Sequence, residues 1–241
     1  MSCLPADVRR PCVFILRCAL VAVALLTCVV PARADKRDYL ETYPYWTPRQ
    51  GEIEFEVYNG WYDRGLPEHQ IEVEYGVTDR FTTGVYGVWG NEGEGGGTRF
   101  NATKLELRYR LAPYRTLPVD PTLYVEYEKA TIAGGADRIE GKLILSKDIG
   151  LLNVTTNLNW EKSLRPGEQT MFEYTVAASY PVSRTVTLGL EIKNNEVERL
   201  RELIPGVYWQ LSRRTRLNIG PAIPLRGSAP VNIRSIFSWE L

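Results

Sequence analysis

The sequence predicts an all-β protein, a single closed antiparallel transmembrane β-barrel of about 12 strands. Three observations support this prediction. Polar and apolar residues alternate with period two, the alternating runs are near ten residues long, and short connections alternate with longer ones. Strands of globular proteins usually have about five or six residues, whereas tilted strands that cross a bilayer need about 9–11. The length of the runs therefore favours a membrane barrel.

Residues 1–34 have the three parts of a secretory signal peptide. A basic start is followed by an apolar run over residues 18–30 and by the small-x-small site Ala32-Arg33-Ala34. As a helix this run spans roughly 20 Å, too short for a hydrocarbon core of about 30 Å. We expect cleavage after Ala34; a lipoprotein signal ending at Cys28 is the alternative. All 4 cysteines lie in this segment, so the mature chain would have no disulfide framework.

An extended lead over residues 35–50, either a periplasmic segment or a plug of the lumen, precedes the expected barrel of residues 51–241. The alternation begins with Glu52-Ile53-Glu54-Phe55-Glu56-Val57 and continues to the end of the chain. Period two places successive side chains on opposite faces of a strand. We expect strands at 51–62, 69–77, 81–90, 100–111, 122–131, 138–147, 151–161, 170–180, 185–193, 203–212, 216–224 and 231–241.

The connections between these strands alternate in length. Tight turns are expected at 78–80, 148–150, 181–184 and 213–215, and longer loops at 63–68, 91–99, 132–137, 162–169, 194–202 and 226–230. Only 112–121 is long where a short turn is due. Short turns at one rim and long loops at the other are typical of transmembrane barrels, with periplasmic turns and extracellular loops. An even number of strands then places both ends of the barrel in the periplasm.

An apolar face that points outward would leave a charged lumen in which acidic residues outnumber basic ones. The candidate lumen-lining residues are Glu52, Glu54, Glu56, Glu72, Glu74, Lys104, Arg108, Arg110, Glu126 and Glu128. Further inward positions are Glu106, Glu140, Glu161, Glu173, Glu191, Glu240, Lys142, Lys193, Arg216 and Arg234. A soluble barrel with its apolar face inward would show the same alternation, so periodicity alone does not choose between the two.

Aromatic residues favour the membrane barrel because they fall near both rims. Those expected at the long-loop rim are Trp61, Tyr62, Trp89 and Trp160, and those at the short-turn rim are Tyr75, Tyr109, Tyr180 and Trp239. Two aromatic belts around an aliphatic band match the interfacial girdles of outer-membrane barrels.

Two stretches resemble known outer-membrane proteins. Phe237, Trp239 and Leu241 share one face of the last strand and resemble the aromatic assembly signal of outer-membrane barrels, which usually ends in Phe. The run Ile71–Phe81, with its Tyr-Gly-Val-Thr-Asp-Arg core, resembles a hairpin of transporter-like outer-membrane proteins associated with phenol meta-pathway degradation. The resemblance implies a presumed channel for small organic compounds. Its partners would be outer-membrane lipids, the barrel-assembly machinery and small solutes.

Composition and charge narrow the function classes. A net charge of +0 excludes a strongly basic nucleic-acid binder. The acidic walls of the lumen favour a cation-leaning passive channel for small polar or organic solutes. A narrow salt-bridged barrel with a structural or surface-binding role is the alternative. We expect no cofactor and no metal, because the mature chain has neither Cys nor a pair of His.

An outer-membrane hydrolase is the less favoured reading. His69, the only histidine of the chain, would be its base, with Asp63, Glu68 and Ser163 as possible partners. Nothing in the sequence brings these residues together, so we expect no enzyme.

Overall fold

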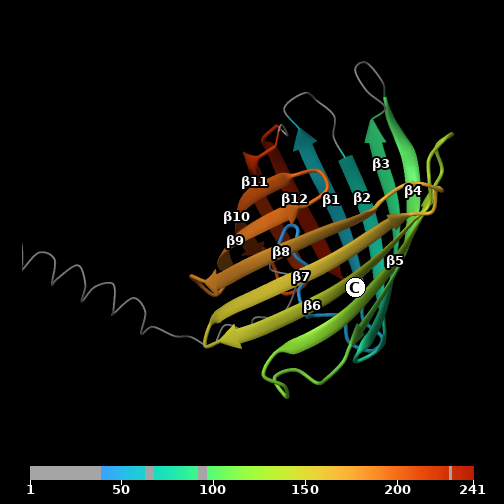
Figure 1. The fold of residues 1–241 in the computed structure, drawn as a ribbon. Helices are drawn as coiled ribbons and strands as arrows, with labels where there is room; N and C mark the ends of the chain where they lie inside the picture. The colour runs from blue at the N-terminus through green and yellow to red at the C-terminus, as the bar shows by residue number, and fades with distance from the viewer. Residues whose placement is uncertain (1–38, 63–67, 92–96, 228–229) are drawn as a thin grey trace, which may run out of the picture. The chain divides into compact units, whose positions relative to one another are not determined.

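The computed structural model describes residues 39–62, 68–91, 97–227 and 230–241, which form a closed barrel of antiparallel strands (Figure 1). The expected signal peptide lies outside the described residues. The strands are β1 (Ile53–Tyr62), β2 (Glu68–Thr78), β3 (Phe81–Asn91), β4 (Thr98–Arg110), β5 (Asp120–Ala130), β6 (Arg138–Ile149), β7 (Leu152–Ser163), β8 (Thr170–Pro181), β9 (Val186–Asn195), β10 (Leu200–Gln210), β11 (Thr215–Arg226) and β12 (Asn232–Glu240). The predicted fold class, an all-β antiparallel barrel of 12 strands, is confirmed.

Each strand pairs with its neighbours in the sequence, and pairing between β1 and β12 closes the sheet. In that closing pair Phe55 lies opposite Trp239, and Val57 lies opposite Phe237. The expected boundaries hold to within a few residues, with one larger difference at β10. We predicted its start at residue 203, but the hairpin pairing already begins where Leu200 lies opposite Asn195. Closure leaves no edge strand with unpaired backbone groups.

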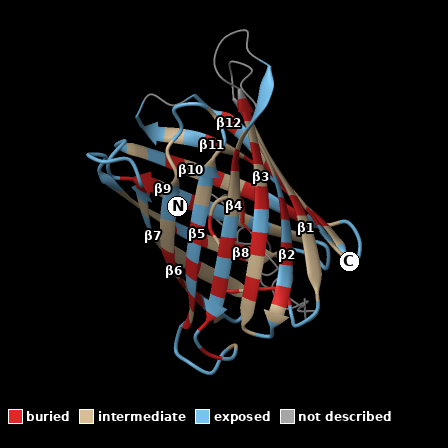
Figure 2. Ribbon diagram, turned by 90° about the vertical axis from the view of Figure 1, so that its right-hand side faces the viewer, coloured by how far each residue is buried: buried red, intermediate tan, exposed pale blue. Residues whose placement is uncertain are grey.

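The apolar face of the sheet points outward. Val125 and Val73 are 51% and 46% exposed, whereas Glu72 and Glu74, beside Val73 in β2, are buried. Figure 2 shows the same alternation of buried and exposed residues along the strands. Because the polar side chains fill the interior, the arrangement is the opposite of a soluble barrel with an apolar core. None of the described residues forms a helix long and apolar enough to cross a membrane.

Most of the aromatic residues predicted for the two belts lie on the outer surface. Exposed members are Trp61, Tyr75, Tyr109, Trp160 and Trp239, and Trp89 and Tyr180 are of intermediate exposure. The side chain of Tyr62 lies outside the described part of the chain. The interfacial role of these residues stays a prediction.

Asp137 ties the loop before β6 to the end of β5. Its carboxylate accepts hydrogen bonds from the hydroxyl of Tyr127 (2.6 Å), the ammonium of Lys129 (2.9 Å) and the N–H of Ala130 (3.1 Å). The side-chain hydrogen bonds from Lys129 and Tyr127 hold the pKa of Asp137 below its usual value. The ionised form of Asp137 therefore fastens this loop at the long-loop rim.

Candidate functional site

Residues 39–48, which we call the inner segment, lie inside the barrel (Figure 1, blue). The segment starts near the short-turn rim, where the side chain of Asn218 in β11 donates to the carbonyl of Tyr39 (3.2 Å). It reaches mid-lumen and returns to the same rim, where the N–H of Gly51 donates to the carbonyl of Gly76 in β2 (2.8 Å). The inner segment is therefore a loop inserted from one rim.

One buried carboxylate anchors the first part of this loop. Glu191 of β9 accepts hydrogen bonds from three consecutive backbone N–H groups, those of Leu40 (2.6 Å), Glu41 (3.0 Å) and Thr42 (2.8 Å). The hydroxyl of Tyr208 donates to the same carboxylate (3.2 Å). Hydrogen bonds to an ionised acceptor are roughly twice as strong as neutral ones. Glu191 therefore satisfies a run of backbone donors that β-pairing does not.

An amide side chain clamps the next residue. Asn157 of β7 accepts from the N–H of Tyr43 (2.6 Å) and donates to the carbonyl of the same residue (2.9 Å). Beyond it, Arg108 donates to the carbonyl of Trp46 (3.3 Å), and Arg110 donates to the hydroxyl of Tyr45 (2.9 Å). Burial raises the pKa of Tyr45 above its usual value, against the effect of the nearby Arg110.

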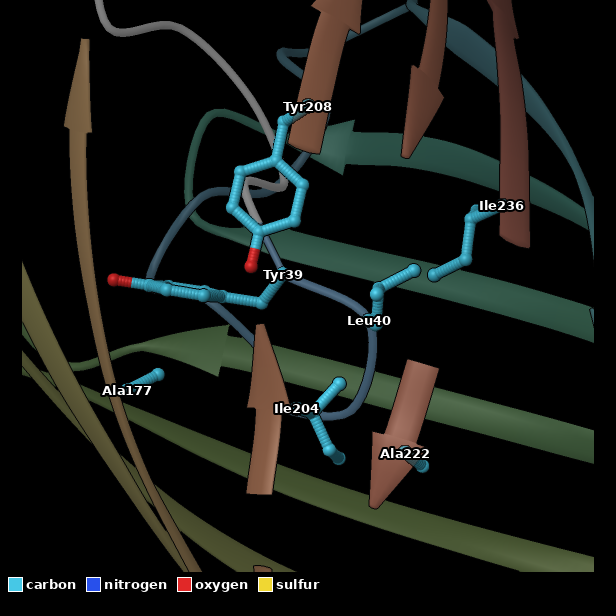
Figure 3. Packing of buried hydrophobic residues seen from close by; sticks show 7 residues of the cluster. All are labelled: Tyr39, Leu40, Ala177, Ile204, Tyr208, Ala222 and Ile236. Atoms are coloured by element: carbon cyan, nitrogen blue, oxygen red, sulfur yellow. The ribbon is translucent and has the colours of Figure 1, made fainter. Parts of the chain in front are cut away.

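An apolar cluster holds the start of the inner segment (Figure 3). Tyr39 and Leu40 pack against inward side chains of β8, β10, β11 and β12, namely Ala177, Ile204, Tyr208, Ala222 and Ile236. The rings of Tyr39 and Tyr208 meet edge to face, with centroids 6.0 Å apart. A Cβ at Gly220 would clash with the carbonyl oxygen of Pro205 in β10 and lie 2.8 Å from Cδ1 of Leu40, so glycine there is required by the neighbouring strand and also leaves room for the segment.

An ion-pair network holds the tip of the segment. The carboxylate of Glu41 pairs with Lys193 of β9 (3.0 Å) and with Arg234 of β12. Lys193 also pairs with Glu173 of β8 (3.3 Å), and Arg234 with Glu202 of β10 (2.9 Å). The network links four strands through one residue of the inner segment.

Three of the five glutamates predicted for the first two strands form a compact buried cluster. Carboxylate oxygens of Glu56, Glu72 and Glu74 lie within 4.8 Å of one another. Tyr58 donates to Glu56 and lies 2.8 Å from Glu72, while Arg108 of β4 pairs with Glu74. Because like charges at this separation repel, such a cluster requires a shared proton or a nearby cation.

The other predicted lumen residues are placed as follows. Glu56, Glu72, Glu74, Arg108, Arg110 and Glu126 are buried, and Glu52, Glu54, Lys104 and Glu128 are partly buried. Lys104 joins two of them, at 3.2 Å from Glu126 and 3.6 Å from Glu128. Glu52 accepts from the N–H of Arg49 at the short-turn rim, away from this group (2.8 Å). Whether these residues line a conducting path stays a proposal.

A cavity of about 330 Å³, which we call the vestibule, lies between the inner segment and the long-loop rim. Leu40 and Tyr43 of the inner segment form part of its lining. Its charged lining consists of Lys104, Lys142, Lys193, Glu41, Glu68, Glu126, Glu140, Glu161 and Glu173. Glu72 and Glu74 are not part of this lining. The acidic surface that faces free space thus belongs mainly to β5–β8, whereas our strongest sequence candidates lay on β1 and β2.

The candidate hydrolase residues are not assembled. Nδ1 of His69 lies 2.7 Å from Oδ1 of Asn59, Glu68 accepts from Gln70 (2.9 Å), and Ser163 accepts from the N–H of Arg165 (3.2 Å). Asp63 lies outside the described residues. The described residues therefore show no hydrogen-bonded pair of His69 with a nucleophile or an acid from the predicted set.

Sequence reasoning missed how the inner segment is held. No sequence motif marks Tyr39, Glu41 or the amides of residues 40–42. In the sequence, Glu191 and Asn157 do not differ from other residues expected to point inward. The signal that could have found them is Glu191 itself, since a buried carboxylate in mid-strand needs several donors.

No protein-family model and no curated protein matches the sequence. Solved structures share its fold. The KdgM porin has a TM-score of 0.61 at 8% identity, covering 77% of this chain and 98% of its own. The NanC porin has a TM-score of 0.56 at 11% identity, covering 78% and 100%. An outer-membrane channel from Pseudomonas putida F1 has a TM-score of 0.53 at 11% identity, covering 87% and 100%. These likenesses show the barrel fold.

Proposed function

We propose that this protein is an outer-membrane channel for small polar or organic solutes, closed at rest by the inner segment. One observation carries the proposal. The closed barrel has an apolar outer surface and a charged interior, and its vestibule ends on a separate loop of the chain. The KdgM porin was also solved in complex with disordered oligogalacturonate, so one barrel of this fold binds a polar solute.

The outer surface supports a place in a membrane. A row of exposed aliphatic side chains runs across β2–β4 through Val73, Val85 and Leu105, and the next exposed residue of β4, Leu107, lies opposite Val125 of β5. In water such a belt would be an exposed apolar patch around the whole barrel, whereas in lipid it is the expected surface. Export by the signal peptide and insertion by the barrel-assembly machinery belong to the same proposal, with Phe237, Trp239 and Leu241 as the assembly signal.

The inner segment supports a gate because it is not part of the sheet. It is held by side chains of β4, β7, β9, β11 and β12. The inner segment contributes no strand to the closed barrel, in which each strand pairs with its two neighbours. Its two ends reach the same rim, so it can withdraw without breaking a strand pair. Withdrawal would extend the vestibule toward the short-turn rim.

A narrow barrel with a structural or surface-binding role is the second candidate. It is favoured by the interior ion pairs, since Arg108 and Lys104 are each shared by two carboxylates. In that case the interior would stay filled when the inner segment is absent.

Conductance in planar lipid bilayers distinguishes the two. We expect small conductance from the full chain and at least a several-fold larger conductance from a variant that lacks residues 39–48. Heat-modifiable migration on gels checks that the variant is folded. A synthetic peptide of residues 39–48, added to that variant, should lower the conductance again, and a peptide with Leu40 and Thr42 replaced by proline is the matched control because it lacks two of the three N–H donors to Glu191.

Each outcome has a clear reading. A folded deletion variant that conducts no better than the full chain would exclude the gated channel and favour the filled barrel. The ion selectivity of the channel has a separate test. If the preference for cations arises in the vestibule, the double variant Glu72→Gln/Glu74→Gln should keep it. Loss of that preference would instead assign it to the first two strands.

A further inference from the structure

The vestibule has an excess of hydrogen-bond acceptors and of negative charge. Six glutamates line it against three lysines. Each lysine is already paired: Lys104 with Glu126 (3.2 Å), Lys142 with Glu140 (3.2 Å), and Lys193 with both Glu41 (3.0 Å) and Glu173 (3.3 Å). The lining therefore carries three more carboxylates than ammonium groups, and two of the six carboxylates, Glu41 and Glu161, pair with Arg234 and Arg138, which are not part of the lining. A cation entering the vestibule would gain from this imbalance.

The strand register concentrates the excess at one place. Glu126, Glu140 and Glu161 lie directly opposite one another on β5, β6 and β7. Like charges directly opposite across strands are destabilising unless a cation lies between them. Lys104 and Lys142 neutralise the first two members of this row. Within the described part of the chain, the ion pair of Glu161 at its end is with Arg138, 3.4 Å away, whose side chain is 48% exposed.

A buried acceptor without a donor lies beside Glu161. Oδ1 of Asn159, two residues earlier on the same face of β7, has no hydrogen-bond partner among the described residues, and the residue is only 7% exposed. Its Nδ2 donates to Glu173 of β8 (3.4 Å), which fixes the amide so that the oxygen is the free end. A buried polar atom without a partner is costly, so this oxygen points to a donor-bearing ligand.

The aromatic lining already holds an ammonium group. Nζ of Lys142 lies 4.0 Å from the ring centroid of Tyr43, a vestibule residue, and 4.0 Å from that of Tyr124. Rings at this distance attract a cation through their negative faces. The volume, about 330 Å³, is near the lower end of the roughly 300–1,000 Å³ typical of ligand pockets. The ligand that fits this chemistry is small and cationic.

We propose that the vestibule binds a small organic ammonium ion, whose N–H donors are taken by Asn159, Glu161 and Glu173. These three residues form the acceptor triad. A primary ammonium has three N–H donors and no acceptor, which matches three acceptors on neighbouring strands. The inference rests on the proposed function, because the vestibule would be the entrance of the channel, and it names the class of solute admitted there.

Equilibrium binding to the full chain in detergent tests the proposal. Putrescine is the probe, and isothermal titration calorimetry is the measurement. We expect saturable binding of putrescine and none of succinate or 1,4-butanediol, which have similar length but carry carboxylates or no charge. Succinate or the diol binding as tightly as putrescine would overturn the proposal. So would a folded full chain that binds no putrescine, or Ca²⁺ binding more tightly than putrescine through the same residues.

Variants then assign the residues. Glu161→Gln and Glu173→Gln should each weaken putrescine binding at least fivefold, and so should Asn159→Leu, which removes the free acceptor oxygen. Glu198→Gln is the matched control, since it removes the same charge from an exposed residue between β9 and β10, and should change affinity less than twofold. Equal effects of Glu198→Gln and Glu161→Gln would show general attraction only and refute the triad.

This test is independent of gating. Binding to the full chain requires no open pore, and the conductance of the variant lacking residues 39–48 requires no amine. If the deletion variant conducts but the full chain binds no putrescine, only the proposed ligand class is refuted. If the full chain binds putrescine but the deletion variant does not conduct, only the proposed channel function is refuted.

Discussion

Glu191→Gln should release the inner segment from the barrel wall. The carboxylate accepts three backbone N–H groups at 2.6–3.0 Å, and bonds to a charged acceptor contribute roughly 1.5–3 kcal/mol each. Glutamine keeps one acceptor oxygen and turns an NH₂ group toward the remaining donor, so at least one such bond is lost and the others lose their charge. We expect the docked state to lose about 2–4 kcal/mol, which is roughly a 30- to 700-fold shift toward the released state.

Cysteine labelling measures this shift directly. Thr42 is fully buried in the docked segment, and the 4 cysteines of the chain all lie within residues 1–34, so they can be replaced by serine. In Thr42→Cys, a water-soluble maleimide should react slowly, at a rate proportional to the released population. Adding Glu191→Gln should raise that rate by the factor above, and the single-channel conductance should show longer open periods.

The control is another buried glutamate that does not contact the inner segment. Glu126 is bonded to Lys104 and Tyr124, so Glu126→Gln should change the labelling rate less than about threefold. If Glu191→Gln labels no faster than this control, the carboxylate does not anchor the segment and the reasoning fails.

Three further substitutions test the packing, the membrane surface and the loop. Gly76→Ala would place a Cβ against backbone oxygens of the chain just before β1, so it should destabilise the folded barrel by about 1–3 kcal/mol in urea unfolding. Gly141→Ala is the control, because a Cβ there would have no atom within 4 Å and should leave the stability unchanged. Equal stabilities of the two variants would refute the close approach at Gly76. Val125→Arg, on the exposed face of β5, should cost roughly 2–4 kcal/mol of stability in lipid vesicles, and Val182→Arg in a short turn about 0–1 kcal/mol; equal costs would contradict a bilayer around β5. Because the pKa of Asp137 is lowered in the folded state, its hold on the loop is complete above the unfolded value near 4 and is lost as pH falls through the lower folded value. The rate of proteolysis in this loop should therefore rise at low pH, and Asp137→Asn should be cleaved at that higher rate already at pH 7. A rate that does not change with pH would refute the attachment of the loop by the ionised Asp137 carboxylate.

Much of the barrel could be predicted because its physics is local. Period-two alternation, as in Lys104-Leu105-Glu106-Leu107, assigns the two faces of a strand without knowledge of its neighbours. Run length and turn spacing then supply the strand count and the two rims. The same reasoning placed Lys104 near Glu126, since both are inward positions on adjacent strands.

The candidate site could not be predicted in this way because it depends on non-local contacts. Glu191 and the amides it accepts are about 150 residues apart in sequence. Thr42 and its neighbours have no periodic pattern, so the sequence predicts either a periplasmic segment or a plug for residues 35–50. Likewise, Glu161 and Asn159 become distinctive only through what surrounds them, since charge patterns do not reveal which carboxylates are already paired.

The barrel wall holds the inner segment through its main-chain atoms as well as through the side chains of Tyr39, Leu40 and Glu41. Side chains of Glu191, Asn157, Arg108 and Asn218 bond its amides and carbonyls, which every non-proline residue supplies. The main-chain bonds do not depend on residue type, but they require the spacing of residues 40–43 to be kept. In a mutational scan, insertions and deletions within 40–43 should therefore be far more harmful than substitutions at the same positions. Selection on this barrel would then act more strongly on the length of this loop than on the types of its residues.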